Sequence, residues 1–293
     1  MRLVLLLLCG SLVLTACSAI SIGEQDVFFP KPSVTPHTFD LEGVHLSDTT
    51  VPVADSVNVN AWYLTQADAQ ATVLFFGGNG FYLVQSRSYL RALTRPSVNA
   101  LLWDYRGYGR SEGEPSVTAF REDAIAVYDH LVEVRGVNPK RLLVWGHSLG
   151  SFLAAHVATE RDVGGVVLEN PATTVDDWVG HLIPWYVRLF LGVDVDPALR
   201  AESNVEQVRA LEVPLLVVAG AEDNVTDPAM ARRLHREAGS KDKELVVVDD
   251  GAHNGLAETE TVQAAYRALV GTVAQTAAAS QAVTEEGPRG EYR

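Results

Sequence analysis

Ser148 is the residue with the clearest potential for covalent chemistry. It lies in Gly146-His147-Ser148-Leu149-Gly150, which matches the pattern G-x-S-x-G between a short apolar run and helix-forming residues. In such a turn the serine adopts a strained backbone conformation, and the flanking glycines avoid collisions with neighbouring backbone. A serine exposed in this way attacks a carbonyl carbon once a general base removes its proton. The alternative is a glycine-rich turn with an idle serine, but the predicted strand and helix around it favour a nucleophile.

A general base and a carboxylate that orients it are expected at the ends of later strands. His253 follows the last predicted strand, and Asp223 follows the strand before it. The histidine would take the serine proton, and the carboxylate would select its tautomer and stabilise the imidazolium. Glu169 is the second choice for this carboxylate, and Asp250 is a weaker one. Of the other histidines, His147 belongs to the turn around Ser148 and His156 to the helix after it. The rest are not near predicted strand ends, namely His37, His45, His130, His181 and His235.

The loop Gly77-Gly78-Asn79-Gly80 follows a buried strand and offers backbone N–H groups. Two functions compete for it, a phosphate cradle and an oxyanion hole. The phosphate-binding spacings G-x-G-x-x-G and G-x-x-x-x-G-K-S/T are both missing from it, which disfavours the cradle. An oxyanion hole would use the backbone N–H groups of Asn79 and Leu149. No metal-ligand spacing such as H-E-x-x-H occurs, so neither a metal nor a cofactor is predicted.

These residues need a scaffold that brings several strand ends together. Apolar runs alternate with segments of helical spacing, which predicts an α/β fold with a doubly wound, mainly parallel sheet of about eight strands. The two opening strands are expected to be antiparallel. Catalytic groups belong at the carboxyl ends of the parallel strands. The predicted strands are 39–47, 56–64, 71–76, 100–104, 142–145, 163–168, 214–220 and 244–249.

Residues 171–211 interrupt the alternation of strands and helices. Large apolar side chains concentrate there, among them Trp178, Trp185 and Phe190. They predict a small helical cap over the strand ends, in which Trp185 and Phe190 help to form a pocket for an acyl chain. The alternative is an ordinary packing helix followed by a loop.

The catalytic domain is predicted to span residues 37–276, including the cap. Before it, residues 17–36 are polar, contain proline and lack periodicity, which indicates a tether. After it, residues 277–293 are rich in Ala, Gln and Glu and are expected to be disordered.

Residues 1–16 have the form of a secretory signal. Arg2 precedes an apolar run that is too short to span a bilayer comfortably. Its end, Leu14-Thr15-Ala16-Cys17, resembles the lipobox of bacterial lipoproteins, which implies cleavage before Cys17 and lipid attachment to its sulfur. An ordinary cleaved signal with an incidental cysteine is the alternative. Cleavage would also remove Cys9, the other cysteine, so no disulfide is expected.

The net charge limits the partners that the protein can bind. A formal charge of −14 at pH 7 repels phosphate backbones and anionic headgroups, so nucleic acid is not an expected partner. Membrane attachment would have to come from the lipid on Cys17. Ser18, rather than an aspartate, follows that cysteine. The usual sorting pattern then implies the periplasmic face of the outer membrane, if the source is Gram-negative.

The order Ser, Asp, His along the chain resembles that of α/β-hydrolases. The resemblance covers roughly residues 39–274 and is strongest with the serine aminopeptidase and monoacylglycerol-lipase-like branch. Residues 104–111, Asp-Tyr-Arg-Gly-Tyr-Gly-Arg-Ser, look like the D-x-R-G-x-G-x-S block of that branch. Residues 77–80 correspond to its H-G-x-G oxyanion loop. There Gly77 replaces a histidine that normally braces the loop.

These features predict a membrane-tethered serine hydrolase of the bacterial envelope, of the carboxylic ester hydrolase type. It would cleave a small-molecule ester or thioester through an acyl-enzyme, with Ser148, His253 and Asp223 as nucleophile, base and orienting acid. Two alternatives stay open. One is a serine peptidase of the same fold, acting on amides. The other is a non-catalytic lipoprotein on a hydrolase scaffold.

Overall fold

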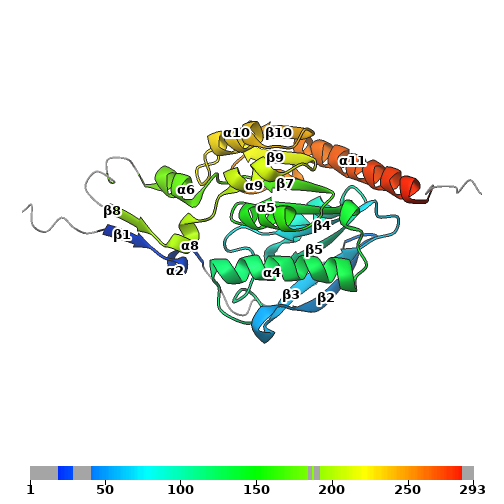
Figure 1. Cartoon of the computed structure of the whole chain (residues 1–293), viewed down its shortest axis with the longest axis horizontal. Helices are drawn as coiled ribbons and strands as arrows, with labels where there is room; N and C mark the ends of the chain where they lie inside the picture. Colours follow the sequence, from blue (N-terminus) through cyan, green and yellow to red (C-terminus); the bar gives the residue numbers. More distant parts are fainter. Residues whose placement is uncertain (1–18, 29–40, 184–186, 188–191, 286–293) are drawn as a thin grey trace, which may run out of the picture.

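The structure is a computed structural model that describes residues 19–28, 41–183, 187 and 192–285. The predicted lipid-attachment residue Cys17 and the predicted cap contacts Trp185 and Phe190 lie outside these residues. At the centre is an eight-stranded sheet with the strand order β10-β9-β7-β6-β4-β5-β3-β2 (Figure 1).

The sheet is parallel from β10 to β5 and antiparallel at the other edge, where β3 pairs with β5 and β2 with β3. The predicted α/β fold with a mainly parallel sheet of about eight strands is therefore confirmed. Every residue of β4, β6, β7 and β9 is buried, as expected for parallel strands covered on both faces. The strand bounds are β2 His45–Pro52, β3 Asn58–Thr65, β4 Ala71–Phe76, β5 Val98–Trp103, β6 Leu142–His147, β7 Gly165–Glu169, β9 Leu215–Gly220 and β10 Lys243–Val248.

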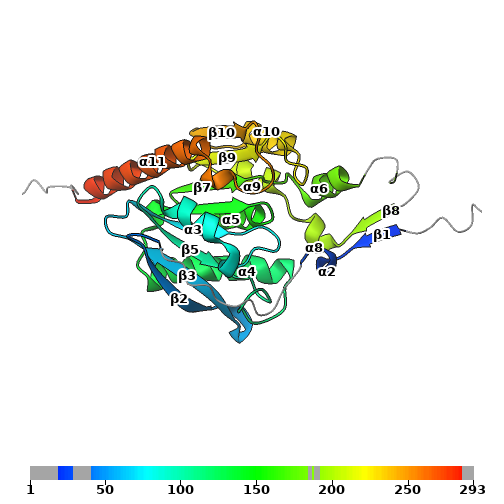
Figure 2. The ribbon, with the colours of Figure 1, turned by 180° about the vertical axis from the view of Figure 1, so that it is seen from behind.

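Helices cover both faces of the sheet. Helices α4 (Val117–Asp129) and α5 (Gly150–Glu160) pack together on the face seen in Figure 1. Helices α3 (Arg87–Thr94) and α11 (Glu260–Glu285) lie on the opposite face (Figure 2), and α10 (Pro228–Glu237) packs beside β9 and β10. No helix in the described part of the chain is long and apolar enough to cross a membrane.

The strand register brings the polar chemistry to one edge of the sheet. Phe76 at the end of β4 pairs with Gly146 of β6, and His147 pairs with Glu169 at the end of β7. At the β10 end of the sheet, Val248 of β10 pairs with Gly220 of β9. The loops that follow these strands therefore emerge side by side, at the carboxyl edge where α/β sheets hold their ligands.

The interval predicted as a helical cap contains a strand as well as helices. Among its described residues are α6 (Val175–Leu182), β8 (Gly192–Val195), α8 (Pro197–Arg200) and α9 (Asn204–Ala210). Helix α9 packs against α5 and α10, so it belongs to the body of the domain. Helices α6 and α8 with strand β8 project beyond the sheet edge (Figures 1 and 2).

The prediction that residues 17–36 form only a tether is wrong for residues 19–28. Strand β1 (Ala19–Ile22) pairs in parallel with β8, and helix α2 (Glu24–Val27) follows it (Figure 1). Val27 and Phe28 are buried. A four-residue strand has too few positions for a detectable period, and its partner lies far away in the sequence, so local composition could not reveal it.

The predicted disorder after residue 276 is also wrong as far as Glu285. Helix α11 continues to that residue, and Ala277 is fully buried. Alanine, glutamine and glutamate are all good helix formers. The composition that suggested a disordered tail is equally suited to extending a helix whose first turns are packed on the sheet.

Candidate active site

Ser148 occupies the turn between β6 and α5 with a φ of +52°, a conformation that costs a residue with a side chain about 1–3 kcal/mol. The surrounding backbone leaves no room for side chains at the two flanking glycines. A Cβ on Gly146 would lie 2.3 Å from the carbonyl oxygen of Gly150, and one on Gly150 would lie 2.1 Å from that of Phe76. The two glycines of the motif are thus required by close packing of the turn.

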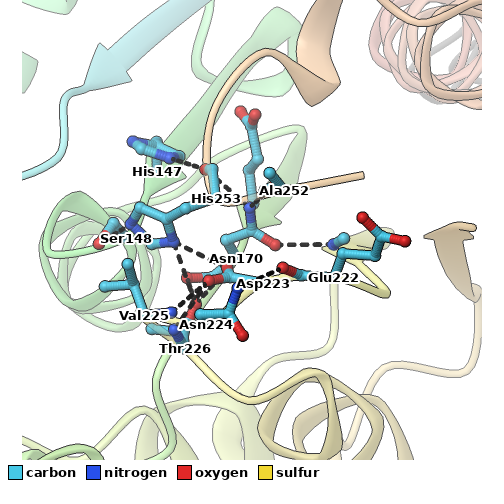
Figure 3. A network of polar contacts seen from close by, with 12 residues as sticks. His147, Ser148, Asn170, Glu222, Asp223, Asn224, Val225, Thr226, Ala252 and His253 are labelled. Carbon is cyan, nitrogen blue, oxygen red and sulfur yellow. Dashed lines mark hydrogen bonds and ion pairs between the residues drawn. The ribbon is translucent and has the colours of Figure 1, made fainter. Parts of the chain in front are cut away.

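The structure brings together the three residues that the sequence predicted as a triad (Figure 3). The Nε2 atom of His253 lies 3.0 Å from the Ser148 hydroxyl oxygen. The Nδ1 atom of the same ring lies 2.7 Å from Oδ2 of Asp223. Both distances are within hydrogen-bond range, so one imidazole connects the hydroxyl to the carboxylate.

The Asp223 carboxylate is fully enclosed and accepts several hydrogen bonds besides that of His253. Its Oδ1 accepts the backbone N–H groups of Val225 at 2.7 Å and Thr226 at 3.0 Å, and its Oδ2 accepts the Thr226 hydroxyl at 2.7 Å. Burial would raise the pKa of this carboxyl, but the hydrogen bonds outweigh burial and hold the pKa below its ordinary value. Asp223 is therefore ionised at neutral pH and can orient the ring.

Two side chains hold the backbone of His253. The Asn170 amide donates to the carbonyl oxygens of Ala252 at 3.2 Å and His253 at 2.8 Å. The His147 ring lies with Nε2 at 2.9 Å from the same His253 carbonyl (Figure 3). Burial lowers the pKa of His147 to about 4, so this ring is neutral and its Nε2 carries the donated proton. Sequence reasoning did not identify Asn170, whose only signal is its place directly after a buried strand.

Neither of the other two acid candidates reaches His253. Glu169 is fully buried, with Oε2 at 3.0 Å from the Trp145 indole nitrogen and Oε1 at 3.3 Å from the Tyr89 hydroxyl. Burial raises the pKa of Glu169 to about 7. Asp250 is exposed in the turn after β10. The geometry thus selects Asp223 as the carboxylate partner of the ring.

The loop at 77–80 approaches Ser148 closely. A Cβ added to Gly78 would lie 2.7 Å from Nδ1 of His147 and 3.3 Å from Cβ of Ser148, so only glycine fits there. Asn79 and Leu149, the two predicted oxyanion residues, line the same cavity as Ser148. The 77–80 loop therefore lies directly beside the turn that carries Ser148.

Aromatic side chains support this loop where Gly77 occupies the position at which the resemblance implies a histidine. A Cβ at Gly77 would lie 2.2 Å from the Phe81 ring, so Phe81 fills the space beside it. The Tyr105 hydroxyl donates to the Gly77 carbonyl at 2.7 Å, and the Tyr108 hydroxyl donates to Oδ1 of Asn79 at 3.1 Å. Both tyrosines belong to the 104–111 block, whose function in bracing the loop was not evident from the sequence.

An apolar cavity of about 90 Å³ opens beside Ser148. Its walls come from α4, α5, the cap and the N-terminal segment, and they include Val27, Phe28, Phe120, Phe152, Leu153, Trp178 and Leu199. Arg121 and Glu202 also line it and form an ion pair at 3.0 Å. Among the described residues, no group of three or more His, Cys, Asp or Glu side chains is placed to hold a metal ion.

The fold is similar to that of several solved esterases. An esterase from Pyrococcus furiosus superposes with a TM-score of 0.64 at 17% sequence identity, covering 84% of this chain and 96% of that one. Acetyl xylan esterase 1 from Thermoanaerobacterium superposes with a TM-score of 0.59 at 17% identity, covering 82% and 87%. At this identity the similarity concerns the fold.

The sequence is similar to proteins from bacteria and plants. It is 28% identical over 230 residues to the uncharacterized protein Rv2307c of Mycobacterium tuberculosis, covering 78% of this chain and 79% of that protein. It is 26% identical over 258 residues to the alpha/beta hydrolase domain-containing protein WAV2 of Arabidopsis thaliana, covering 82% and 83%. Residues 67–201 and 195–260 match the family described as serine aminopeptidase, S33, which is more than half of the chain. The protein therefore belongs to this family of α/β-hydrolases.

Proposed function

We propose that this protein is a serine hydrolase that cleaves carboxylic esters or thioesters through an acyl-enzyme. One observation carries the proposal. The Ser148 hydroxyl, the His253 ring and the Asp223 carboxylate form a continuous chain of hydrogen bonds, at 3.0 and 2.7 Å, beside an apolar cavity. A hydroxyl in this arrangement can lose its proton to the ring as it attacks a carbonyl carbon.

The reaction has two halves that use the same groups. First, Oγ of Ser148 bonds to the acyl carbon while Nε2 of His253 takes the hydroxyl proton, and the ring then returns that proton to the departing alcohol or thiol. Second, water attacks the acyl-enzyme, gives its proton to the ring and releases the acid, and Oγ regains a proton. The N–H groups of Asn79 and Leu149 would stabilise the oxyanion in both halves.

The cavity favours an acyl chain over a peptide amino terminus. An aminopeptidase site needs a free carboxylate for the substrate ammonium group. Among the described residues that line the cavity, Glu202 is the one carboxylate, and Arg121 already pairs with it at 3.0 Å. The solved proteins of similar fold that are named esterases support the same choice. A peptidase remains the alternative because the family description names one.

A fluorophosphonate probe and a substrate panel test this proposal. The probe should label the wild type and fail to label the Ser148→Ala variant. Butyryl and octanoyl aryl esters should be hydrolysed much faster than aminoacyl aryl amides. Ser148→Ala and His253→Ala should each reduce kcat by several orders of magnitude, and the double variant should be hardly worse, because the triad acts as a unit. Faster turnover of the amides would instead support the peptidase.

We also propose that the chain is anchored in the bacterial envelope by a lipid on Cys17. The observations behind this are the apolar run at the N-terminus and the lipobox-like residues 14–17. In a Gram-negative source the anchor would be in the outer membrane, with the enzyme on its periplasmic face.

A further inference from the structure

We propose that the N-terminal segment, residues 19–28, completes the active site by holding the proposed oxyanion loop in place and by forming one wall of the acyl cavity. The inference rests on the proposed esterase function and extends it to a part of the chain that the sequence marks as a tether. In this view, residues 19–28 are a positioning element for the reaction.

The segment is attached to the domain at several separate points. All four residues of β1 pair with β8, from Ala19 with Gly192 to Ile22 with Val195. The backbone N–H of Val117, at the start of α4, donates to the Glu24 carboxylate at 2.8 Å. These contacts join the segment to the cap on one side and to the domain body on the other.

The segment reaches the loop through Asn79. The Nδ2 of Asn79 donates a short hydrogen bond to the backbone carbonyl of Val27, while Oδ1 accepts from the Tyr108 hydroxyl at 3.1 Å. Both ends of the amide are therefore held, one by the segment and one by the 104–111 block. Because the backbone N–H of the same residue is the proposed oxyanion donor, the side-chain contacts determine where that donor points.

The segment also closes the cavity on the side of α4. Val27 and Phe28 are 6% and 4% exposed and line the same space as Ser148. The Phe28 ring packs on the Phe120 ring with centroids 4.7 Å apart. If the segment left its place, Phe120 would lose its cover and Asn79 would lose its carbonyl partner. The two consequences are distinct, since the first concerns acyl binding and the second concerns the oxyanion.

Variants of the full-length chain separate these effects. Val27→Ser with Phe28→Ser removes the buried anchors of the segment without adding charge, and Ser21→Ala with Gln25→Ser changes two of its exposed positions as a matched control. Asn79→Ala keeps the backbone donor but removes the side-chain contacts with Val27 and Tyr108. The assay measures kcat and KM on acetyl and octanoyl aryl esters, with thermal melting of each variant to confirm folding.

The anchor variant should lower kcat on the acetyl ester by about 10- to 100-fold, which is less than the loss of a whole oxyanion donor. Its KM on the octanoyl ester should rise as well. Asn79→Ala should lower kcat at least as much, because it also removes the contact with Tyr108. In the Asn79→Ala background the anchor changes should lower acetyl kcat no further, because the contact with Val27 is already lost. The control should match the wild type.

The positioning function would be overturned if a folded anchor variant kept the acetyl kcat of the wild type. It would also be overturned if the kcat losses of the anchor changes and of Asn79→Ala multiplied when the two were combined. An inactive wild type would instead count against the proposed esterase function. The two failures are thus distinguishable in one set of assays.

Discussion

The side-chain amide of Asn170 donates to the backbone carbonyl of His253 at 2.8 Å, and its Oδ1 accepts the backbone N–H of Gly220 at 2.9 Å. One side chain thereby ties the loop that carries the proposed base to the end of β9, just before Asp223. Asn170 itself has a φ of +45°, a left-handed conformation that asparagine tolerates better than most residues.

Asn170 should therefore act as a positioning residue. Asn170→Ala removes its hydrogen bonds and leaves a strained backbone, and we expect kcat to fall about 10- to 100-fold with little change in KM. Asn170→Gly removes the backbone strain but does not restore the hydrogen bonds. Compared with Asn170→Ala, it should therefore have a higher stability but an equally low kcat. The measurements are steady-state kinetics and thermal melting. Full recovery of kcat in the glycine variant would show that only the backbone conformation matters.

Changing Glu169 or Asp223 to its amide should have very different effects on kcat. Asp223→Asn should reduce kcat on the order of 10⁴-fold because the His253 ring loses its orienting carboxylate. Glu169→Gln should leave kcat nearly unchanged, since Glu169 contacts Trp145 and Tyr89 and not the ring. Steady-state kinetics on a butyryl ester compares the two variants directly. The opposite ranking would identify Glu169 as the acid.

Glu169 should instead influence stability with pH. Burial raises its pKa from 4.5 to about 7 in the folded protein. As the pH rises from about 4.5 to 7, the unfolded chain releases this proton while the folded chain keeps it, so the wild type loses about 2–3 kcal/mol of stability from this group. Glu169→Gln removes the loss. The free energy of unfolding, measured in urea at pH 5 and at pH 7, should therefore change in favour of the variant. The value for the variant minus the value for the wild type should be larger at pH 7 than at pH 5. An equal difference at both pH values would contradict it.

The sheet and the three triad positions could be predicted because their signals are local. Buried parallel strands form continuous apolar runs, and Ser148, Asp223 and His253 each lie within a few residues of the end of such a run. Their meeting then follows from strand topology.

The positions that sequence reasoning missed depend on contacts between distant segments. The hydroxyl of Tyr108 reaches Asn79, and β1 pairs with residues 192–195. No sequence pattern predicts either contact. Tyr108 is one tyrosine in a glycine-rich loop, and β1 is only four residues long. Long-range pairing of this kind appears only when the fold has assembled both partners.

The Arg121–Glu202 pair should limit acyl chain length. Both residues line the cavity beside Ser148 and also a second groove between α4, α5 and α8, so the pair forms a wall between the two. Arg121 also donates to Nδ1 of His156 at 3.2 Å, and this hydrogen bond keeps the Arg121 side chain between the two spaces. Changing both residues to alanine should join the spaces and raise kcat/KM for dodecanoyl relative to butyryl esters by at least about tenfold.

Two controls separate bulk from charge in this wall. Arg121→Met with Glu202→Leu removes both charges but keeps the volume, so the chain-length ratio should stay within about twofold of the wild type. Glu122→Ala alters the second groove alone and should also leave the ratio unchanged. An unaltered ratio in the folded double-alanine variant would show that the pair does not limit the chain.

Cys17 should anchor the protein and hold the cap close to the membrane. Strand β1 begins at Ala19, so only Ser18 separates it from the proposed lipid. Two residues can span at most about 7 Å, so β1 and its partner β8 would lie near the bilayer surface. Cys17→Ser should release the protein into the soluble fraction, since a chain with a formal charge of −14 is repelled by anionic headgroups. A wild type found soluble on fractionation would end the proposal.

The short link between Cys17 and β1 should matter for substrates held in a membrane. A flexible Gly/Ser spacer of about 20 residues, inserted between Ser18 and Ala19, keeps the anchor but lets the domain move roughly 25 Å from the surface. Hydrolysis of long-chain esters embedded in vesicles should then fall several-fold, whereas hydrolysis of a soluble butyryl ester should stay unchanged because residues 19–28 are intact. Both substrates are assayed with the same protein preparation. If hydrolysis of the vesicle-embedded ester and of the soluble ester fell in parallel, the spacer would have damaged the active site. Equal vesicle activity with and without the spacer would mean that the enzyme takes its substrate from solution.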